Sequence, residues 1–557
     1  MTSPLAESTA LAGCCVPLEA WTPKAQRLLC PELQELIARV HRELELERAK
    51  LLIARQERQE CWNLGECPDD LPDDELSEAR GDWRIAPLPS DLMHRRVEVS
   101  APSCAADRVV DVLSRNADGV LADAATLDFE DSMKPCWGNV LEGLVNLVGA
   151  AEGTLSSHRR EIGRELRLDA DDRPLILVRP RGLHLEESNV LVDGAAVSAA
   201  LFDVVCSAYW SARTLLDQAR TPTFSVPKCE HHLEARWWNR LLERIEEELD
   251  LPSRTIKAIF LVETLSAVFQ MEEILYQARD RVAGMSLDCH DMAFSDLKVL
   301  CRHPDRILAD RATLGFERPW MRNAALRLIS VCHRHGGFAI GDMTALGPSQ
   351  RSAGASGPAP AGAELDFGFA MGHDGCRVAS QDLILPALDA YSGDHQPELA
   401  PLMLDRAELL PEGCGPRSLS GLRSNVRVGI AGLRAWNEDD LGSVDGPGRP
   451  ANLATFEIAR AQTWQWLHHG TALEDGEPVT LDLVRRIFAE EQTRIERELA
   501  EKRAGLHEVE SYRRARLDAE TIFTEPRLRP FLSMASDPAG LALDLRRARL
   551  RRDGAAD

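Results

Sequence analysis

Two apolar runs in the middle of the sequence each end in an acidic residue. Glu263 ends the run KAIFLVE, and Asp291 ends the next run, VAGMSLDCHD. If these runs are neighbouring strands of a parallel barrel, both carboxylates lie at the same mouth. Two carboxylates, completed by substrate oxygens and waters, are ligands that Mg²⁺ accepts. We therefore predict a Mg²⁺ ion on Glu263 and Asp291; the alternative is that each residue caps a strand or helix, or pairs with an arginine.

Short apolar runs alternate with helical stretches between about residues 95 and 385, which is the pattern of repeated βα units. The eight runs are residues 95–102, 119–132, 175–182, 221–230, 255–264, 282–291, 336–345 and 374–381. Eight such units predict an α/β fold, a (β/α)₈ TIM barrel. Charged residues follow several runs, at the end of a barrel where active sites lie. They are Asp128, Glu130, Asp131, Arg179, Arg181, Lys228, Glu230, Glu263, Asp288, Asp291 and Asp342.

The segments on both sides of this barrel have helical patterns. Residues 25–63 carry apolar residues at three-and-four spacing, which predicts one or two amphipathic helices. After about residue 395 the strands stop and helical patterns dominate. We expect an N-terminal helical clasp (1–92), the TIM barrel (93–392) and a C-terminal helical domain (393–557). Residues 351–364, which are Gly, Ala, Ser and Pro for the most part, are expected to form a flexible loop.

Composition limits the partners of the protein. Its 557 residues have a formal net charge of -24, which repels nucleic-acid backbones and anionic membranes. No apolar run reaches the roughly 18 residues of a membrane span. We therefore expect small-molecule substrates, no nucleic acid and no membrane, with a monomer or a small homo-oligomer. The 14 cysteines form no CxxC pair and the start resembles no signal peptide, so reduced thiols and a cytoplasmic location are expected.

Longer motifs add a family resemblance. The stretches are DFEDSMKPCW, VRPRGLHLEE, TIKAIFLVETLSAVFQMEEILY, HPDRILADRA, GHDG and FEIARAQTWQWLHH. In sequence and order they resemble malate synthase of the shorter A type, over about residues 80 to 535. The resemblance implies an N-terminal clasp, a (β/α)₈ barrel and a C-terminal helical domain. It also implies an enzyme that condenses acetyl-CoA with glyoxylate using Mg²⁺.

The resemblance implies roles for single residues as well, and both predicted metal ligands stand at family positions. Arg181, in RPRG, corresponds to the family's catalytic arginine, which holds the oxo and enolate oxygens. A planar, permanently charged guanidinium suits that task. The alternative for Arg181 is a salt bridge with the Asp128, Glu130 and Asp131 cluster, and Arg179 is expected to be structural. We assign Asp131 to substrate binding.

The first departure from the family concerns the catalytic base. Where the family has the aspartate that takes a proton from the thioester methyl, this chain has Asn452, and a carboxamide has no basic site at neutral pH. Asn452 also suits a helix N-cap, but aspartate caps equally well. General-base assistance is worth about 10² to 10⁴ in rate, so ordinary malate synthesis should be slow or absent. His290 is the obvious substitute base, unless it is a bystander at the mouth.

The second departure lies at the sixth run. The family reads Gly-Arg-Trp-Asp, a turn whose backbone amides receive the carboxylate of glyoxylate, and this chain reads Asp288, Cys289, His290 and Asp291. At about 4 Å and an effective dielectric near 20, Asp288 beside a bound carboxylate would cost on the order of 4 kcal/mol. Either its side chain points away, or the second substrate is not a small 2-oxo acid bound in the family's manner. We assign Asp288 and Cys289 to substrate binding.

Three functions agree with these residues. The first, which we favour, is a malate synthase-like enzyme that uses Mg²⁺ and Arg181 on an acyl-CoA such as acetyl-CoA, with a changed acceptor or reaction. The second is authentic malate synthesis from acetyl-CoA and glyoxylate with a substitute base. The third is a non-catalytic protein that binds CoA thioesters. Retention of Glu263, Asp291 and Arg181 together speaks against the third, because gathering charged groups is costly.

Overall fold

Eight parallel strands close into a barrel in this computed structural model, which describes residues 13–159, 164–169, 171–344, 361–393, 404–438 and 453–532. The strands are β2 (Val97–Pro102), β3 (Ala124–Asp128), β6 (Leu175–Arg179), β9 (Thr223–Val226), β10 (Lys257–Val262), β11 (Val282–Leu287), β12 (Phe338–Thr344) and β13 (Gly375–Val378). They pair in this order, and β13 pairs with β2 to close the sheet. Each predicted apolar run contains one strand, so the (β/α)₈ prediction is confirmed.

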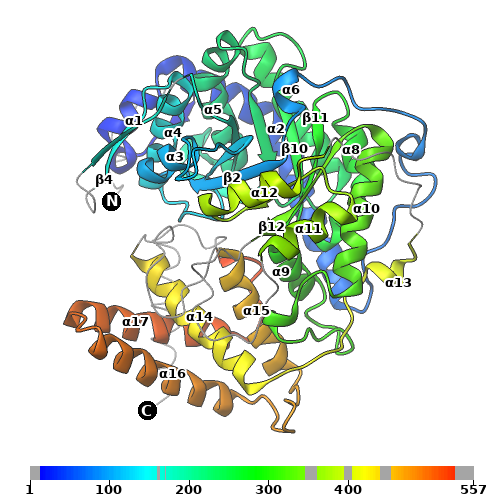
Figure 1. Ribbon diagram of the computed structural model, residues 1–557, viewed down its shortest axis with the longest axis vertical. Coiled ribbons are helices and arrows are strands. Elements are labelled where there is room, and N and C mark those ends of the chain that lie inside the picture. Colours follow the sequence, from blue (N-terminus) through cyan, green and yellow to red (C-terminus); the bar gives the residue numbers. More distant parts are fainter. Residues whose placement is uncertain are drawn as a thin grey trace, which may run out of the picture.

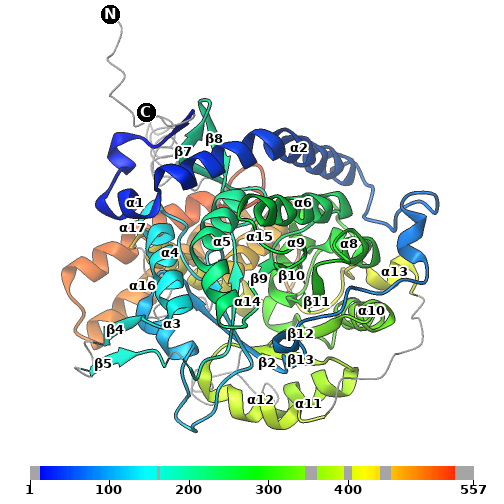
Figure 2. The same cartoon turned by 90° about the horizontal axis from the view of Figure 1, so that it is seen from above.

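The strands are continuous apolar runs because both of their faces are covered. Every residue of β3, β6, β9, β10 and β11 is buried. Helices follow the strands and surround them, as Figure 2 shows for several of them. They are α3 (Ala106–Val112), α4 (Trp137–Glu152), α5 (Ala199–Asp217), α6 (His232–Glu248), α7 (Leu265–Val268), α8 (Met271–Gln277), α9 (Cys289–Val299), α10 (Pro319–His335), α11 (Ala361–Met371) and α12 (Ile384–Ala390).

The pairing of β10 with β11 sets the level of the residues that follow both strands. Val262 at the end of β10 pairs with Leu287 at the end of β11. One step further, the Asp288 amide donates a hydrogen bond to the Val262 carbonyl oxygen at 3.1 Å. Glu263 and Asp288, the first residues after β10 and β11, therefore lie side by side at the carboxyl end of the barrel, as the sequence predicts.

Two helices precede the barrel, α1 (Pro23–Leu28) and the 33-residue α2 (Pro31–Asn63), which agrees with the prediction for residues 25–63. α2 packs along α5 and α6, on the outside of the barrel in Figure 2. Two buried arginines attach it to loops at the mouth. Arg48 donates to the carbonyl oxygens of Leu183 and Leu185 at 2.8 and 3.1 Å, and Arg55 donates to the Lys228 carbonyl oxygen at 2.7 Å.

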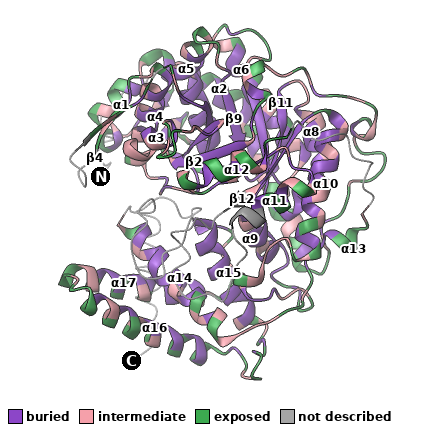
Figure 3. Ribbon diagram, in the orientation of Figure 1, coloured by how far each residue is buried: buried purple, intermediate pink, exposed green. Residues whose placement is uncertain are grey.

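The C-terminal helices build a core of their own. They are α14 (Leu419–Asn437), α15 (Leu453–His468), α16 (Leu481–Glu501) and α17 (Leu506–Phe523), and they lie together at one end of the molecule (Figure 1). α15 is buried throughout from Leu453 to Trp466, whereas α16 has an exposed face (Figure 3). The buried α15 packs against α9, so it joins the C-terminal helices to the barrel.

The predicted loop at residues 351–364 lies for the most part outside the described residues. Its last four residues, 361–364, belong to the first turn of α11. The domain boundaries at residues 92 and 392 stay a prediction. Among the described helices, none is long and apolar enough to cross a membrane.

Candidate active site

Three buried carboxylates meet at the carboxyl end of the barrel. Asp131 follows β3, Glu263 directly follows β10, and Asp291 lies in the first turn of α9 after β11. One carboxylate oxygen from each lies within 4.8 Å of the other two. The structure therefore brings together the two predicted metal ligands. Asp131, which was predicted to bind substrate, joins the same group.

The loop after β3 brings its acidic residues to this point because Asp128 organises the backbone. The Asp128 carboxylate accepts hydrogen bonds from the amides of Glu130 at 2.8 Å and Ser132 at 3.2 Å. These bonds turn the loop directly after the strand. Glu130 and Asp131 are buried as a result, with exposed fractions of 4% and 6%.

Two cations contact the carboxylates. Arg179, the last residue of β6, places Nη2 3.0 Å from Glu130 Oε2 and 3.3 Å from Glu263 Oε2, and it also pairs with Asp131. Lys228, which follows β9, places Nζ 2.7 Å from Asp291 Oδ1 and 2.9 Å from Asp131 Oδ2. Burial lowers the pKa of both cations, but the surrounding carboxylates outweigh it and hold each pKa well above its ordinary value. Both remain charged at neutral pH.

The carboxylates outnumber these cations. Burial raises the pKa of Glu130, Glu263 and Asp291, and neighbouring acids raise it further. For Asp131, Arg179 and Lys228 outweigh burial and lower the pKa to about 2. A buried group of hard oxygen donors with too little positive charge suits a divalent cation such as Mg²⁺. The chemistry of the donor set therefore fits that ion.

Arg181, predicted to be the catalytic arginine, lies outside this group of carboxylates, and its catalytic role stays a prediction. Its Nη2 and Nε lie 2.8 and 2.9 Å from the two carboxylate oxygens of Asp203, and its Nη1 lies 2.9 Å from Glu187 Oε2. This buried guanidinium holds the loop after β6 to α5 and β7 (Glu186–Val192). The strand ends at Arg179, so Arg179 faces the carboxylates, whereas Arg181 is already in the loop.

Asp288 occupies the N-terminus of α9 with its own side chain. Oδ1 accepts hydrogen bonds from the amides of His290 and Asp291, each at 3.1 Å, and Oδ2 lies 2.8 Å from Nη2 of Arg377 in β13. Burial raises the pKa of Asp288, but Arg377 and His290 outweigh it and hold that pKa below its ordinary value. The carboxylate is therefore ionised and directed at the helix amides, which favour an anion there.

Cys289 and His290 lie on the side of Asp288 that faces β12. The Cys289 amide donates to Asp342 Oδ1 at 3.2 Å, and burial raises the pKa of the Cys289 thiol well above its usual value. One nitrogen of the half-buried His290 lies within 4.8 Å of carboxylate oxygens of Asp288 and Asp342. His290 therefore belongs to a second polar group, next to the three carboxylates.

Comparison with known proteins gives the family. A family model described as "Malate synthase, TIM barrel domain" matches residues 175–401, and one described as "Malate synthase, C-terminal" matches residues 417–536. Malate synthase of Myxococcus xanthus (strain DK1622) is 37% identical over 537 residues, which cover 95% of this chain and 96% of that protein. The chain belongs to the malate synthase family.

Further malate synthases agree with this assignment. Malate synthase A of Escherichia coli (strain K12) is 35% identical, with 86% of this chain and 90% of that protein covered. Malate synthase of Oryza sativa subsp. japonica is also 35% identical, with 93% of each chain covered. The protein is thus an enzyme of the acyl-transferring malate synthase family.

Asn452, which the resemblance places at the position of the family's base, lies outside the described residues. The next residue, Leu453, begins α15, and its amide lies 3.3 Å from the backbone carbonyl oxygen of Asp131. The start of α15 is therefore held against the loop that carries Asp131. The catalytic roles predicted for Asn452 and His290 stay predictions.

Three important side chains were not assigned from the sequence. Lys228 was recognised as a charged residue after a strand, and this was the signal for its place in the mouth. Arg377 lies within β13, where nothing in the local pattern distinguishes it. Asp203 lies on the buried face of α5, and only tertiary structure reveals that it holds Arg181.

Proposed function

We propose that this malate synthase homologue acts on an acyl-CoA, with acetyl-CoA the first candidate, and on a second substrate that does not place a carboxylate on the α9 amides. The observation that carries the proposal is the position of Asp288. Its carboxylate accepts hydrogen bonds from the amides of His290 and Asp291, which belong to the turn that receives the glyoxylate carboxylate in the family. A second carboxylate there would meet repulsion and find those donors already used.

The acidic group would hold Mg²⁺ through Asp131, Glu263 and Asp291. When bound, the ion polarises a carbonyl oxygen and stabilises negative charge that develops on it. Arg179 takes over the role predicted for Arg181, because its guanidinium faces the same carboxylates while Arg181 is held by Asp203 and Glu187. A fixed guanidinium next to the reacting oxygen stabilises an oxyanion without reorganising during the reaction.

The substitution of the family's base by Asn452 supports a changed reaction as well. A carboxamide can donate a hydrogen bond to a carbonyl or thioester oxygen, but it cannot take a proton from carbon. Thioester hydrolysis, acyl transfer to a nitrogen or oxygen nucleophile, and cleavage of a 3-hydroxyacyl thioester do not need Asn452 as a base that removes a carbon-bound proton. Each of them can use Arg179 and the metal position.

Authentic malate synthesis is the second candidate, and the relatives favour it, since proteins named malate synthase match nearly the whole chain. In that case His290 is the proposed substitute base. Its nearness to Asp342 supports the proposal, because a neighbouring carboxylate can orient an imidazole ring. Glyoxylate would then have to displace the Asp288 carboxylate from the α9 amides.

One assay separates the two candidates. The purified protein is incubated with acetyl-CoA and Mg²⁺, and free thiol is followed with no acceptor, with glyoxylate and with neutral aldehydes. We expect glyoxylate to leave the rate of thiol release unchanged. Malate formed in step with glyoxylate-dependent thiol release would overturn the proposal and establish the second candidate.

The remaining proposals concern location and assembly. All fourteen cysteines are free thiols in the structure, which supports a reducing compartment. We therefore propose a cytoplasmic enzyme that works as a monomer or a small homo-oligomer. Gel filtration with light scattering tests the assembly, and a large oligomer would contradict it.

A further inference from the structure

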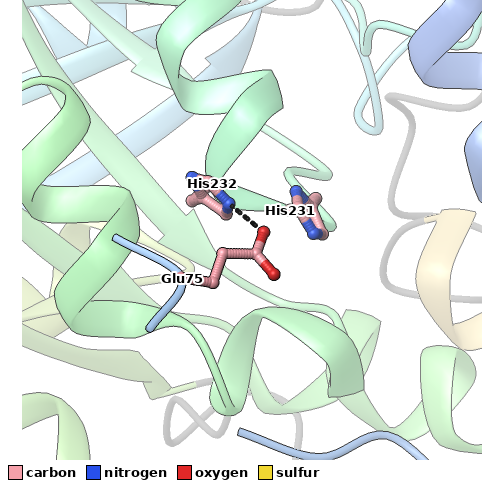
Figure 4. Close-up of side chains that lie close together, drawn as sticks. All are labelled: Glu75, His231 and His232. Atoms are coloured by element: carbon pink, nitrogen blue, oxygen red, sulfur yellow. Dashed lines mark hydrogen bonds and ion pairs between the residues drawn. The ribbon is translucent and has the colours of Figure 1, made fainter. Parts of the chain in front are cut away.

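A second group of potential metal ligands lies where the segment after α2 meets the start of α6. Its members are Glu75, His231 and His232, drawn in Figure 4. His231 directly precedes α6, His232 is its first residue, and Glu75 lies just before a short 3₁₀ helix at residues 77–80. None of the three takes part in the proposed catalytic group.

The three side chains converge. His232 Nε2 lies 3.3 Å from Glu75 Oε1, and the two imidazole rings are 4.5 Å apart between centroids. One ligand atom from each residue lies within 4.8 Å of the others. Figure 4 shows both rings beside the Glu75 carboxylate. This spacing allows one small ion to contact all three after minor side-chain adjustment.

Burial opposes protonation of both histidines. Burial and the nearby Arg58 lower the pKa of His231 to about 3, and burial lowers the pKa of His232. Neutral imidazoles offer a lone pair to a metal ion, and two histidines with one glutamate are an established ligand set for zinc. The nitrogen donors distinguish this group from the oxygen-only group at the barrel mouth.

The second nitrogen of each ring has a neighbour. The Gln277 amide Nε2 donates to His232 Nδ1 at 3.1 Å, which leaves the ring proton on Nε2. Metal binding at Nε2 therefore requires the Gln277 carboxamide to turn over, so that its oxygen accepts from Nδ1–H and fixes the ring. His231 Nδ1 accepts a hydrogen bond from the Leu233 amide at 3.2 Å and thereby caps α6. Metal binding at His231 Nε2 places the ring proton on Nδ1, so it competes with this cap and the affinity is reduced accordingly.

We infer that Glu75, His231 and His232 form a binding site for Zn²⁺ or a similar first-row transition-metal ion, with water completing the coordination. The ion would connect the segment after α2 to the barrel rim beside the loop that carries Lys228. Glu75 is exposed and comes from a turn, so the metal would order that segment. The inference is independent of the proposed acyl-CoA chemistry.

Zinc titration of the full-length protein tests this site. Calorimetry is done with Mg²⁺ in large excess, which occupies the oxygen-only group, and bound zinc is counted by elemental analysis after dialysis. We expect one zinc ion per chain. His231→Ala and Glu75→Gln should each weaken zinc binding by roughly tenfold or more, while the matched control His158→Ala, in a hairpin remote in sequence, should bind like the parent protein.

A second readout guards against variants that bind poorly because they are misfolded. Circular dichroism and urea midpoints of all variants are compared without zinc, and zinc should raise the midpoint of the parent protein and the control only. Equal zinc affinity in the parent protein, His231→Ala and Glu75→Gln would overturn the inference, as would the absence of a stoichiometric zinc ion in the parent protein.

Discussion

The carboxylate of Asp288 lies 2.8 Å from the guanidinium of Arg377, across the mouth between β11 and β13. Its other oxygen caps α9. Asp288 thus places a negative charge at the amides of α9. Arg377 neutralises this charge from β13, the strand beyond β12. The proposed function rests on this pair, because the Asp288 carboxylate already occupies the helix amides.

Removing the Asp288 carboxylate should restore an anion site. In Asp288→Gly the α9 amides become free and Arg377 loses its partner, so we expect glyoxylate affinity in the presence of Mg²⁺ to rise at least about tenfold, or 1.4 kcal/mol. Calorimetry measures this. The substitution leaves the buried Arg377 without this partner, which costs about 3–5 kcal/mol, so the urea midpoint should fall. Asp288→Asn, which keeps a capping side chain, is the matched control. Unchanged glyoxylate binding in Asp288→Gly would refute this account of the pair.

The two arginines of the RPRG motif should respond differently to lysine. Removing an oxyanion donor costs about 10² to 10³ in kcat, so Arg179→Lys should abolish most thiol release from the acyl-CoA substrate. Arg181→Lys breaks a bidentate contact with Asp203, which should reduce stability by about 1–3 kcal/mol and affect kcat less. Kinetics and urea unfolding of both variants provide the comparison. The opposite pattern would return the catalytic role to Arg181.

Mg²⁺ should stabilise the folded protein through the acidic group. A ligand at 100 times its Kd adds about 2.7 kcal/mol, so Mg²⁺ should raise the melting temperature and a chelator should reverse the rise. Glu263→Gln should remove the effect, whereas Glu165→Gln, on an exposed hairpin, should not. A Mg²⁺ response that survives Glu263→Gln would place the ion elsewhere.

Mg²⁺ affinity should also increase with pH. The pKa values of Glu263 and Asp291 are raised in the folded protein, so protons compete with the metal at low pH and leave as pH rises. Titrations at a series of pH values between about 5 and 8 show this as a falling Kd. A Kd that does not depend on pH would mean that these carboxylates are already ionised without metal.

Asp296 in α9 should destabilise the protein at neutral pH. It is buried, and within the described part of the chain neither carboxylate oxygen has a hydrogen-bond partner. Burial raises its pKa well above the ordinary value of 3.8, so the folded state keeps a proton that the unfolded chain releases. Below pH 3.8 the carboxyl group is protonated in both states and Asp296 costs no stability. As pH rises above this value, retention of the proton in the folded state lowers the free energy of unfolding.

Asp296→Leu should therefore raise the free energy of unfolding by about 1–3 kcal/mol at pH 8 and by less at pH 4. Urea unfolding at both pH values measures the difference, with Asp389→Leu on the exposed face of α12 as the control. Destabilisation by Asp296→Leu at pH 8 would indicate that the carboxylate has a partner that it needs.

The barrel and the position of its mouth could be predicted from the sequence, because βα units have a regular period and each strand places its next residues at the same end. That is why Glu263 and Asp291 were expected to meet, as they do. The choice between Arg179 and Arg181 could not be made in this way. The residues are two apart, and the outcome depends on where β6 ends, a point that the apolar pattern does not define.

Arg377 and Asp203 could not be found for a related reason. Each acts on a residue far away in the sequence, Asp288 and Arg181 respectively. Local periodicity shows that a position is buried, but it does not show which charged group lies opposite. The direction of the Asp288 side chain, which sequence reasoning left as two alternatives, likewise depended on a partner from another strand.

The pairing of Val262 with Leu287, continued by the hydrogen bond from the Asp288 amide to the Val262 carbonyl oxygen, involves main-chain atoms only. Side-chain replacement at the mouth leaves these bonds intact. Evolution can therefore exchange what surrounds the reacting groups while the backbone continues to hold Glu263 and Asp291 in place. Such a scaffold permits the lining of the mouth to change while the carboxylates of Glu263 and Asp291 keep their positions.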